Sequence, residues 1–138
     1  MGKSKVVIFA LVKNGKILLE KRPVPGFLED QYLIPGGTIG ETENLEQALE
    51  RELKEELGIV PIEFELLIEE DILGLFENTL KPFIIKKWQG QIPKVILDKE
   101  DPYPLEWVDI EKALNIPIES TRRIIEALKK HLNDTHKT

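Results

Sequence analysis

The sequence has 138 residues, a formal net charge of −6, a pI near 5.1 and no cysteine. The lack of cysteine excludes disulfides, thiolate metal sites and a cysteine nucleophile, and the acidic balance argues against a nucleic-acid partner held by phosphate neutralisation. No apolar run reaches the roughly 20 residues that span a bilayer, and the N-terminal segment lacks a signal-peptide cleavage pattern. We therefore expect one cytoplasmic domain over residues 1–138, with no membrane partner.

Two strands are expected at the start of the chain. Residues 5–12 form a continuous apolar run, and the hairpin signal Asn14-Gly15 separates it from a second run over residues 17–19. Prolines and a glycine then open a loop that lasts until about Gln31. The chain is thus predicted to begin with a β-hairpin whose strands are largely buried.

A short strand over residues 32–34 is predicted to run into the turn Pro35-Gly36-Gly37. Glycine lacks a Cβ, so the backbone can come close to a ligand at these positions. An ordinary turn is the alternative interpretation. The turn stands directly before an acidic helix, and this placement favours a functional role.

The helix is predicted from about Asn44 to Leu57. Asn44 can cap its first turn, with Gln47 reaching back three residues later, and Gly58 can take the left-handed conformation that ends a helix. At roughly 100° per residue its apolar side chains define one arc. They are Leu45, Ala48, Leu49, Leu53 and Leu57.

Two glutamates, Glu52 and Glu56, fall inside this apolar arc, and Glu55 borders it. A buried, unpaired carboxylate costs several kcal/mol or gives up its charge, so we expect a positive group there. Side chains at i, i+3 and i+4 project from adjacent turns, and Mg²⁺ and Mn²⁺ take all-oxygen ligands. The alternative is a solvated acidic face with Arg51 and Lys54 as surface partners.

The stretch around this helix resembles the signature of the Nudix hydrolase family. The signature asks for Gly, five residues, Glu, seven residues, Arg-Glu, an aliphatic residue, any residue, Glu-Glu, any residue, Gly and an aliphatic residue. Its places are filled without a gap by Gly37, Glu43, Arg51, Glu52, Leu53, Glu55, Glu56, Gly58 and Ile59. Further similarity in the FIIKKWQGQ and LEWVDIEKAL segments and in the spacing from Arg22 to Pro35 points to the MutT-like branch of the family.

The resemblance implies a role for each matching residue. The metal ligands would be Gly36, through its backbone carbonyl, and Glu52, Glu55 and Glu56. The catalytic group would be Glu52, as general base, with Arg51 and Glu43 tying the loop to the helix and orienting the carboxylates. The substrate-side residues would be Arg22, Gly37, and Glu100 or Asp101, of which one could be an additional acidic ligand. The implied cofactor is Mg²⁺, for which Mn²⁺ can substitute.

The rest of the chain predicts strands, turns and two helical segments. The predicted strands are 63–72, 83–88, 92–97 and 105–108, with a loop over 73–81 and a turn over 89–91. The predicted helical segments are a turn over 110–114 capped by Asp109 and a helix over 120–132, followed by a frayed tail over 133–138. This order describes an α+β domain, and the resemblance implies a mixed sheet sandwiched between helices.

The implied activity is Mg²⁺-dependent hydrolysis of a nucleoside triphosphate, with either a canonical or an oxidised base, to a monophosphate and pyrophosphate by a monomer or homodimer. The alternatives are other substrates, such as ADP-ribose, a dinucleoside polyphosphate or dihydroneopterin triphosphate, a non-catalytic nucleotide-binding module, and an acidic interaction domain without metal. Phe76, Phe83 and Trp88 could stack on a base, although aromatic residues in strands are usually core.

The chain departs from the family at one place that concerns the base. MutT-type proteins that act on oxidised guanine nucleotides tend to present an asparagine from the loop before the last helix. This region reads NIPIESTRR here, with Glu119 or Ser120 in the approximate place and Asn115 too early. The resemblance therefore does not extend to guanine specificity.

Overall fold

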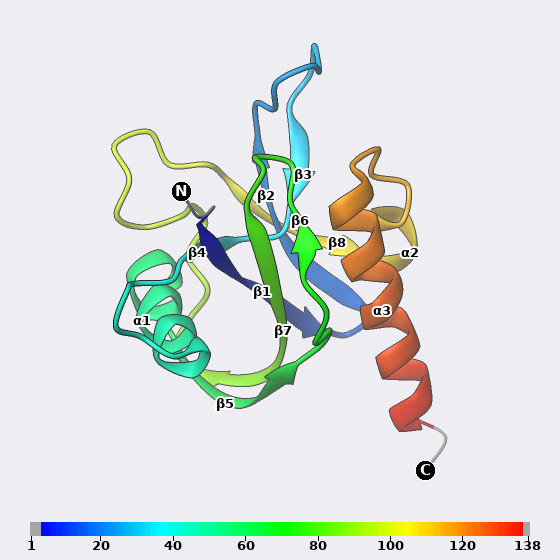
Figure 1. Ribbon diagram of the computed structural model, residues 1–138. Helices are drawn as coiled ribbons and strands as arrows, with labels where there is room; N and C mark the ends of the chain where they lie inside the picture. Colours follow the sequence, from blue (N-terminus) through cyan, green and yellow to red (C-terminus); the bar gives the residue numbers. More distant parts are fainter. Residues whose placement is uncertain (1–3, 137–138) are drawn as a thin grey trace.

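The computed structural model describes residues 4–136, in which helices cover both faces of a mixed sheet (Figure 1). The strands are β1 (Lys5–Lys13), β2 (Lys16–Arg22), β3 (Gln31–Leu33), β4 (Gly36–Thr38), β5 (Val60–Leu66), β6 (Ile72–Leu73), β7 (Thr79–Gln89) and β8 (Leu105–Asp109). The helices are α1 (Leu45–Leu57), α2 (Ile110–Ala113) and α3 (Glu119–His136). No helix in this described part of the chain is long and apolar enough to cross a membrane.

The sheet has the strand order β3-β2-β1-β7-β5, and β1 and β7 run parallel along its centre. One edge of β1 pairs with β7 over Lys5–Leu11, whereas the opposite edge is shared between two partners. There β4 pairs with Val6–Ile8, and β2 pairs only with Val12 and Lys13. The strands β4 and β2 therefore diverge beside β1, and side chains can enter the gap between them.

Alternation along β1 divides the core into two layers. Val7, Phe9 and Leu11 pack with the buried side of α1, while Ile8 and Ala10 pack with α3 on the other face. Figure 1 shows α1 on one side of the sheet and α2 and α3 on the other. A strand that is covered on both faces is apolar throughout, which explains the continuous apolar run in the sequence. The predicted sheet between helices is confirmed.

Several predicted boundaries are wrong because long-range pairing decides them. The predicted strand over 63–72 begins at Val60 and ends at Leu66, and residues 67–71, which include three consecutive acidic side chains, leave the sheet. The predicted loop over 73–81 instead contains the start of β7 at Thr79, which pairs with both β1 and β6. Gly36 and Gly37 were expected in a turn and lie in β4, paired with β1.

The predicted returning strand over 92–97 does not form. The end of β7 already pairs with β5, Gln89 opposite Val60, so this segment has no free strand beside it and makes only an isolated bridge between Val95 and Pro104. It runs instead along the end of α1, where the Leu97 N–H donates to the Glu56 carbonyl at 2.8 Å.

The last helix is longer than predicted. It spans Glu119–His136, so the tail expected to fray from residue 133 is helical up to residue 136, and residues 137–138 lie outside the described part. Asp109 stands at the N-cap of α2 as expected, but its side chain makes no capping hydrogen bond.

Candidate active site

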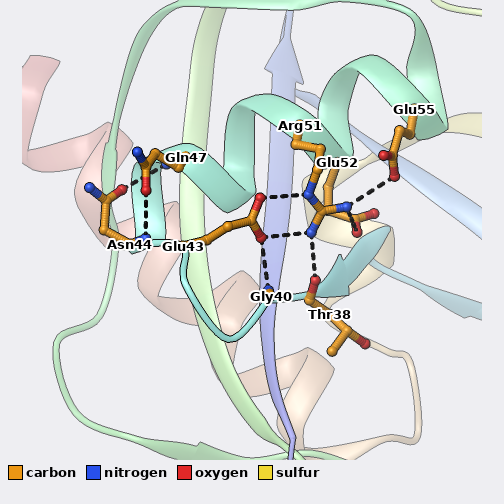
Figure 2. A network of polar contacts seen from close by, with 8 residues as sticks. All are labelled: Thr38, Gly40, Glu43, Asn44, Gln47, Arg51, Glu52 and Glu55. Carbon is orange, nitrogen blue, oxygen red and sulfur yellow. Dashed lines mark hydrogen bonds and ion pairs between the residues drawn. The ribbon is translucent and has the colours of Figure 1, made fainter.

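Helix α1 begins and ends as the sequence predicts. The Asn44 side chain accepts a hydrogen bond from the Gln47 N–H at 2.8 Å, and the Asn44 N–H donates to the Gln47 side chain at 2.9 Å (Figure 2). This reciprocal pair satisfies two N–H groups that the first turn leaves without a partner. Gly58 ends the helix with φ of 68°, a conformation that glycine adopts without steric cost.

The apolar arc of α1 carries two carboxylates into the core layer below it. Glu52 and Glu56 are each 7% exposed, beside the fully buried Leu49 and Leu53, whereas Glu55 is exposed at the border of the arc. The predicted burial of Glu52 and Glu56 is confirmed. A purely structural helix would have aliphatic residues at both positions, because burial of a charge needs a compensating partner.

Arg51 supplies that compensation for one side of the cluster. Its guanidinium donates two hydrogen bonds to Glu43, at 2.6 and 2.8 Å, and one each to Glu52 at 2.8 Å and Glu55 at 3.0 Å (Figure 2). A further bond goes to the Thr38 carbonyl at 2.9 Å. Arg51 therefore joins the helix to the preceding loop and is no surface partner, which is the tying position that the family resemblance implied.

Electrostatic interactions keep both the Glu43 carboxylate and the Arg51 guanidinium charged. Hydrogen bonds from Arg51 and from the Gly40 N–H lower the pKa of Glu43 from its usual 4.5 to about 2. The same contact raises the pKa of Arg51 above its ordinary value, since the Glu43 and Glu52 carboxylates stabilise the cation. The loop is thus held to α1 by a bidentate, charge-assisted pair, the strongest class of hydrogen bond between side chains.

The two glycines of β4 are required by space. A Cβ on Gly37 would collide with the carboxylate of Glu52, and a Cβ on Gly36 would collide with the Val7 carbonyl and the Ile8 side chain. Neither glycine has a positive φ, so the need is for close approach rather than for an unusual backbone conformation. Strand β4 therefore lies directly against the Glu52 side chain.

On the other side of the cluster, the negative charge of Glu56 is compensated by a lysine from the loop before β8. The Lys99 ammonium lies 3.6 Å from the Glu56 carboxylate. Burial, together with repulsion from Glu52, raises the pKa of Glu56, and Lys99 opposes this rise. Glu100 and Asp101, predicted as alternative ligands from the same loop, are exposed, and it is Lys99, between β7 and β8, that contacts Glu56.

The donor set suits a hard divalent cation, since it consists of carboxylate oxygens and a backbone carbonyl. Within residues 4–136, however, no group of three acidic or histidine side chains is close enough together to hold a metal ion. The reason is that Arg51 holds Glu52 and Glu55, and Lys99 holds Glu56. The two basic side chains compensate the charge that a divalent cation would neutralise, and the oxygen chemistry of these residues fits such an ion.

A cavity of about 140 Å³ lies where β4 and β2 diverge. Gly36 lines it from β4, the strand whose next residue, Gly37, lies against Glu52, and Arg22 lines it from β2. The Arg22 guanidinium lies over two aromatic rings, 4.6 Å from the centroid of Tyr103 and 5.3 Å from that of Phe76. Such cation–π contacts fix the position of a guanidinium. The structure thus brings the predicted residue Arg22 to the same cavity as Gly36.

Two of the three aromatic residues considered for base stacking belong to the core. Phe83 is 3% exposed, and Trp88 stacks on Trp107 with the ring centroids 6.1 Å apart. Phe76 is 48% exposed and lines the cavity beside Arg22. The expectation that aromatic residues in strands are usually core holds for Phe83 and Trp88.

Sequence analysis missed three polar residues of the cavity, and Glu20 and Asn78 are the two outside α3. Glu20 follows an apolar strand and precedes two basic residues, so it looked like a solvated strand end. Burial, with a smaller contribution from Glu56, raises its pKa from 4.5 to about 7, although Arg22 and Lys99 oppose the rise. Asn78 lies in the expected loop, where asparagine is common. Only the diverging strands reveal the position of either residue.

Comparison with known proteins identifies the family. The NUDIX domain model matches residues 2–128, nearly the whole chain, and the chain therefore belongs to the Nudix family. It is a Nudix hydrolase, an enzyme that acts on pyrophosphate bonds. The resemblance inferred from the spaced signature is confirmed.

Its relatives lie in the MutT-like branch. An 8-oxo-dGTP diphosphatase of Buchnera aphidicola is 31% identical over 134 residues, covering 94% of this chain and 96% of the relative. A CTP pyrophosphohydrolase of Escherichia coli is 30% identical over 116 residues, covering 83% and 82%. The solution structure of the E. coli ORF135 protein matches with a TM-score of 0.74 at 26% identity, covering 94% of this chain and 91% of that protein.

Proposed function

We propose that the protein is a Mg²⁺-dependent pyrophosphohydrolase that cleaves a nucleoside triphosphate to a monophosphate and pyrophosphate. The observation that carries the proposal is the place of Gly36. This residue lies in the strand that packs on Glu52 and also lines the cavity beside Arg22. A nucleotide with its base in the cavity would therefore bring its phosphates to the glutamates. Relatives named for 8-oxo-dGTP and CTP support a triphosphate substrate.

Glu52, Glu55, Glu56 and the Gly36 carbonyl would hold the cation. When bound, a divalent cation neutralises phosphate charge and lowers the pKa of a coordinated water. Glu52 is our assignment for the general base that takes a proton from the attacking water, since it is buried among apolar neighbours and held in place by Arg51. Arg51 orients this carboxylate by donating a hydrogen bond to it, and Glu43 in turn holds Arg51 in place.

The remaining residues position the nucleotide. Water attacks a phosphorus of the triphosphate chain, the bond to the bridging oxygen breaks, and pyrophosphate and the monophosphate leave with the release of a proton. Arg22, fixed over the rings of Phe76 and Tyr103, would contact the nucleoside part. Glu100 and Asp101 would contribute only if their loop moved towards Glu56. We expect the enzyme to act in the cytoplasm as a monomer or homodimer, without a nucleic-acid partner.

A Mg²⁺-dependent hydrolysis screen tests the proposal. The substrates are canonical and oxidised nucleoside triphosphates, ADP-ribose, nucleotide sugars and dinucleoside polyphosphates, with products separated by chromatography. Glu52→Gln should lower turnover roughly 100- to 10,000-fold, whereas the exposed Glu50→Gln on the same helix should leave it unchanged. Full activity of Glu52→Gln would overturn the assignment. Stoichiometric Mn²⁺ binding without hydrolysis of any substrate would instead indicate a binding module.

A further inference from the structure

The cavity between β4 and β2 contains polar atoms that the protein leaves without partners. Arg22 Nε and Asn78 Oδ1 are buried side-chain atoms with no hydrogen-bond partner among residues 4–136. The Glu20 side chain is 12% exposed, and its closest cation, Arg22 Nη1, is 3.9 Å away, too far for a hydrogen bond. Among the described residues, one small cavity thus holds a buried donor and a buried acceptor without partners, beside a carboxylate whose ion pair with Arg22 is 3.9 Å long.

Unpartnered buried polar groups are rare in folded proteins, because each loses its bonds to water without replacement. Several in one cavity indicate a ligand that supplies the missing partners. The walls are aliphatic, with Ile8, Leu33 and Leu80 among them. A planar molecule with apolar faces and a polar edge matches this combination, and a nucleobase is such a molecule.

The acceptors come from elements other than α3 and the loop before it. The first turn of α3 contributes the hydroxyl residues Ser120 and Thr121 to the cavity. The carboxylate comes from β2, and the amide oxygen comes from the turn between β6 and β7. In that turn the Asn78 carbonyl accepts from the Gly74 N–H at 2.8 Å. A Cβ on Gly74 would collide with the Asn78 side-chain oxygen, so a larger residue at position 74 would displace this acceptor.

The chemistry of the acceptors restricts the base. An ionised carboxylate only accepts hydrogen bonds, and its two oxygens can take two parallel N–H donors. Guanine offers such a pair in its ring N1–H and its neighbouring amino group. Adenine and cytosine offer one amino group beside a ring acceptor, and uracil and thymine offer one N–H between two carbonyls. An acceptor facing an acceptor is repulsive, which discriminates against these bases.

We propose that Glu20, assisted by Asn78, determines base specificity and selects a nucleotide whose base presents two adjacent N–H donors, as guanine and its 8-oxidised form do. The inference rests on the proposed function, because hydrolysis reports the base preference only if the phosphates reach the α1 glutamates. In this proposal the base is recognised by two residues, Glu20 and Asn78, that are not part of the family signature.

The test compares kcat/KM for dGTP, dITP and dATP in the wild type, Glu20→Gln and the exposed control Glu29→Gln. Hypoxanthine lacks the 2-amino group, so dITP removes one donor and leaves the rest of the substrate intact. We expect the wild type to prefer dGTP, and Glu20→Gln to lose roughly 10- to 100-fold on dGTP while its dGTP/dITP ratio falls towards one. The control should match the wild type, and calorimetric Mn²⁺ binding should be the same in all three proteins.

Two results would overturn the inference. One is a wild type that does not distinguish dGTP from dITP. The other is an equal loss on every nucleotide in Glu20→Gln together with weakened Mn²⁺ binding, which would place Glu20 in the metal centre.

Equilibrium binding of dGMP and dIMP without metal separates this inference from the proposed function. If the protein hydrolyses no nucleotide but binds dGMP more tightly than dIMP through Glu20, the proposed function fails and the inference stands. Hydrolysis that is indifferent to the base leaves the proposed function intact and overturns the inference. A protein that neither hydrolyses nor binds these nucleotides overturns both.

Discussion

Replacing Glu20 by glutamine should stabilise the protein at alkaline pH. The carboxyl of Glu20 is enclosed by the sheet, and the charged groups that face it are Arg22 on its own strand, Glu56 on α1 and Lys99 on the loop before β8. Burial is the largest influence and disfavours the ionised form. Glutamine has nearly the same shape and carries no charge at any pH, so the substitution removes the ionisation and little else.

The size of the effect follows from the pKa. Folding raises the pKa of Glu20 from 4.5 to about 7, so the folded state binds this proton more tightly than the unfolded state. The wild type therefore loses stability as the pH rises through this range. At 1.36 kcal/mol for each tenfold change in an ionisation constant, the loss approaches about 3 kcal/mol above pH 7. Glu20→Gln avoids it and should exceed the wild type by up to this amount at pH 8, with little difference below pH 4.5.

Urea denaturation followed by circular dichroism measures this difference. Wild type, Glu20→Gln and the exposed control Glu29→Gln are compared from pH 4 to pH 9 in the presence of a chelator, so that no metal ion alters the charge around Glu56. Titration of the other groups affects all three proteins alike. The reasoning is refuted if the difference between wild type and Glu20→Gln does not change with pH, or if the variant is the less stable protein at pH 8.

Three further substitutions test the cluster around α1. Glu43→Gln weakens the pair that orients Arg51 and should reduce kcat roughly 10- to 100-fold, with unchanged circular dichroism; unaltered kcat would contradict the positioning role. Gly37→Ala puts a methyl group onto the Glu52 carboxylate and should weaken calorimetric Mn²⁺ binding about tenfold or more, whereas retained affinity would mean that β4 moves aside easily. Lys99→Gln removes the cation beside Glu56 and should tighten Mn²⁺ binding by up to about fivefold; weaker binding would show that Lys99 supports the metal site.

Helix α1 and its glutamates could be predicted because their information is local. The cap at Asn44, the stop at Gly58 and the burial of Glu52 and Glu56 all follow from spacing along one helix, and the structure reproduces each of them. The first hairpin was predictable for the same reason, since Asn14-Gly15 fixes a two-residue turn between apolar runs.

The cavity could not be predicted, since it depends on pairing between distant segments. Strand β2 cannot pair with the whole length of β1, because β4 occupies the edge of β1 at Val6–Ile8. Glu20 faces the cavity only because of that divergence, and its neighbours Glu56 and Lys99 come from other elements. The sequence around Glu20 carries no periodic signal that separates a buried carboxylate from a solvated one. The same limitation led to the wrong strand over 92–97.

The two basic side chains that pair with the glutamates, Arg51 and Lys99, differ in how firmly they are fixed. This difference determines which of them a metal ion would displace. Arg51 makes three bonds that do not involve the predicted ligands, two to Glu43 and one to the Thr38 carbonyl, so its position does not depend on Glu52 or Glu55. Lys99 is half-exposed and holds Glu56 by one contact of 3.6 Å, and a single exposed pair of this kind is weak. A cation held by the proposed ligands would therefore compete with Lys99 at little cost, whereas Arg51 would keep its bonds to Glu43 and Thr38. Arg51 would then still orient Glu52, as the proposed role of Glu52 as general base requires.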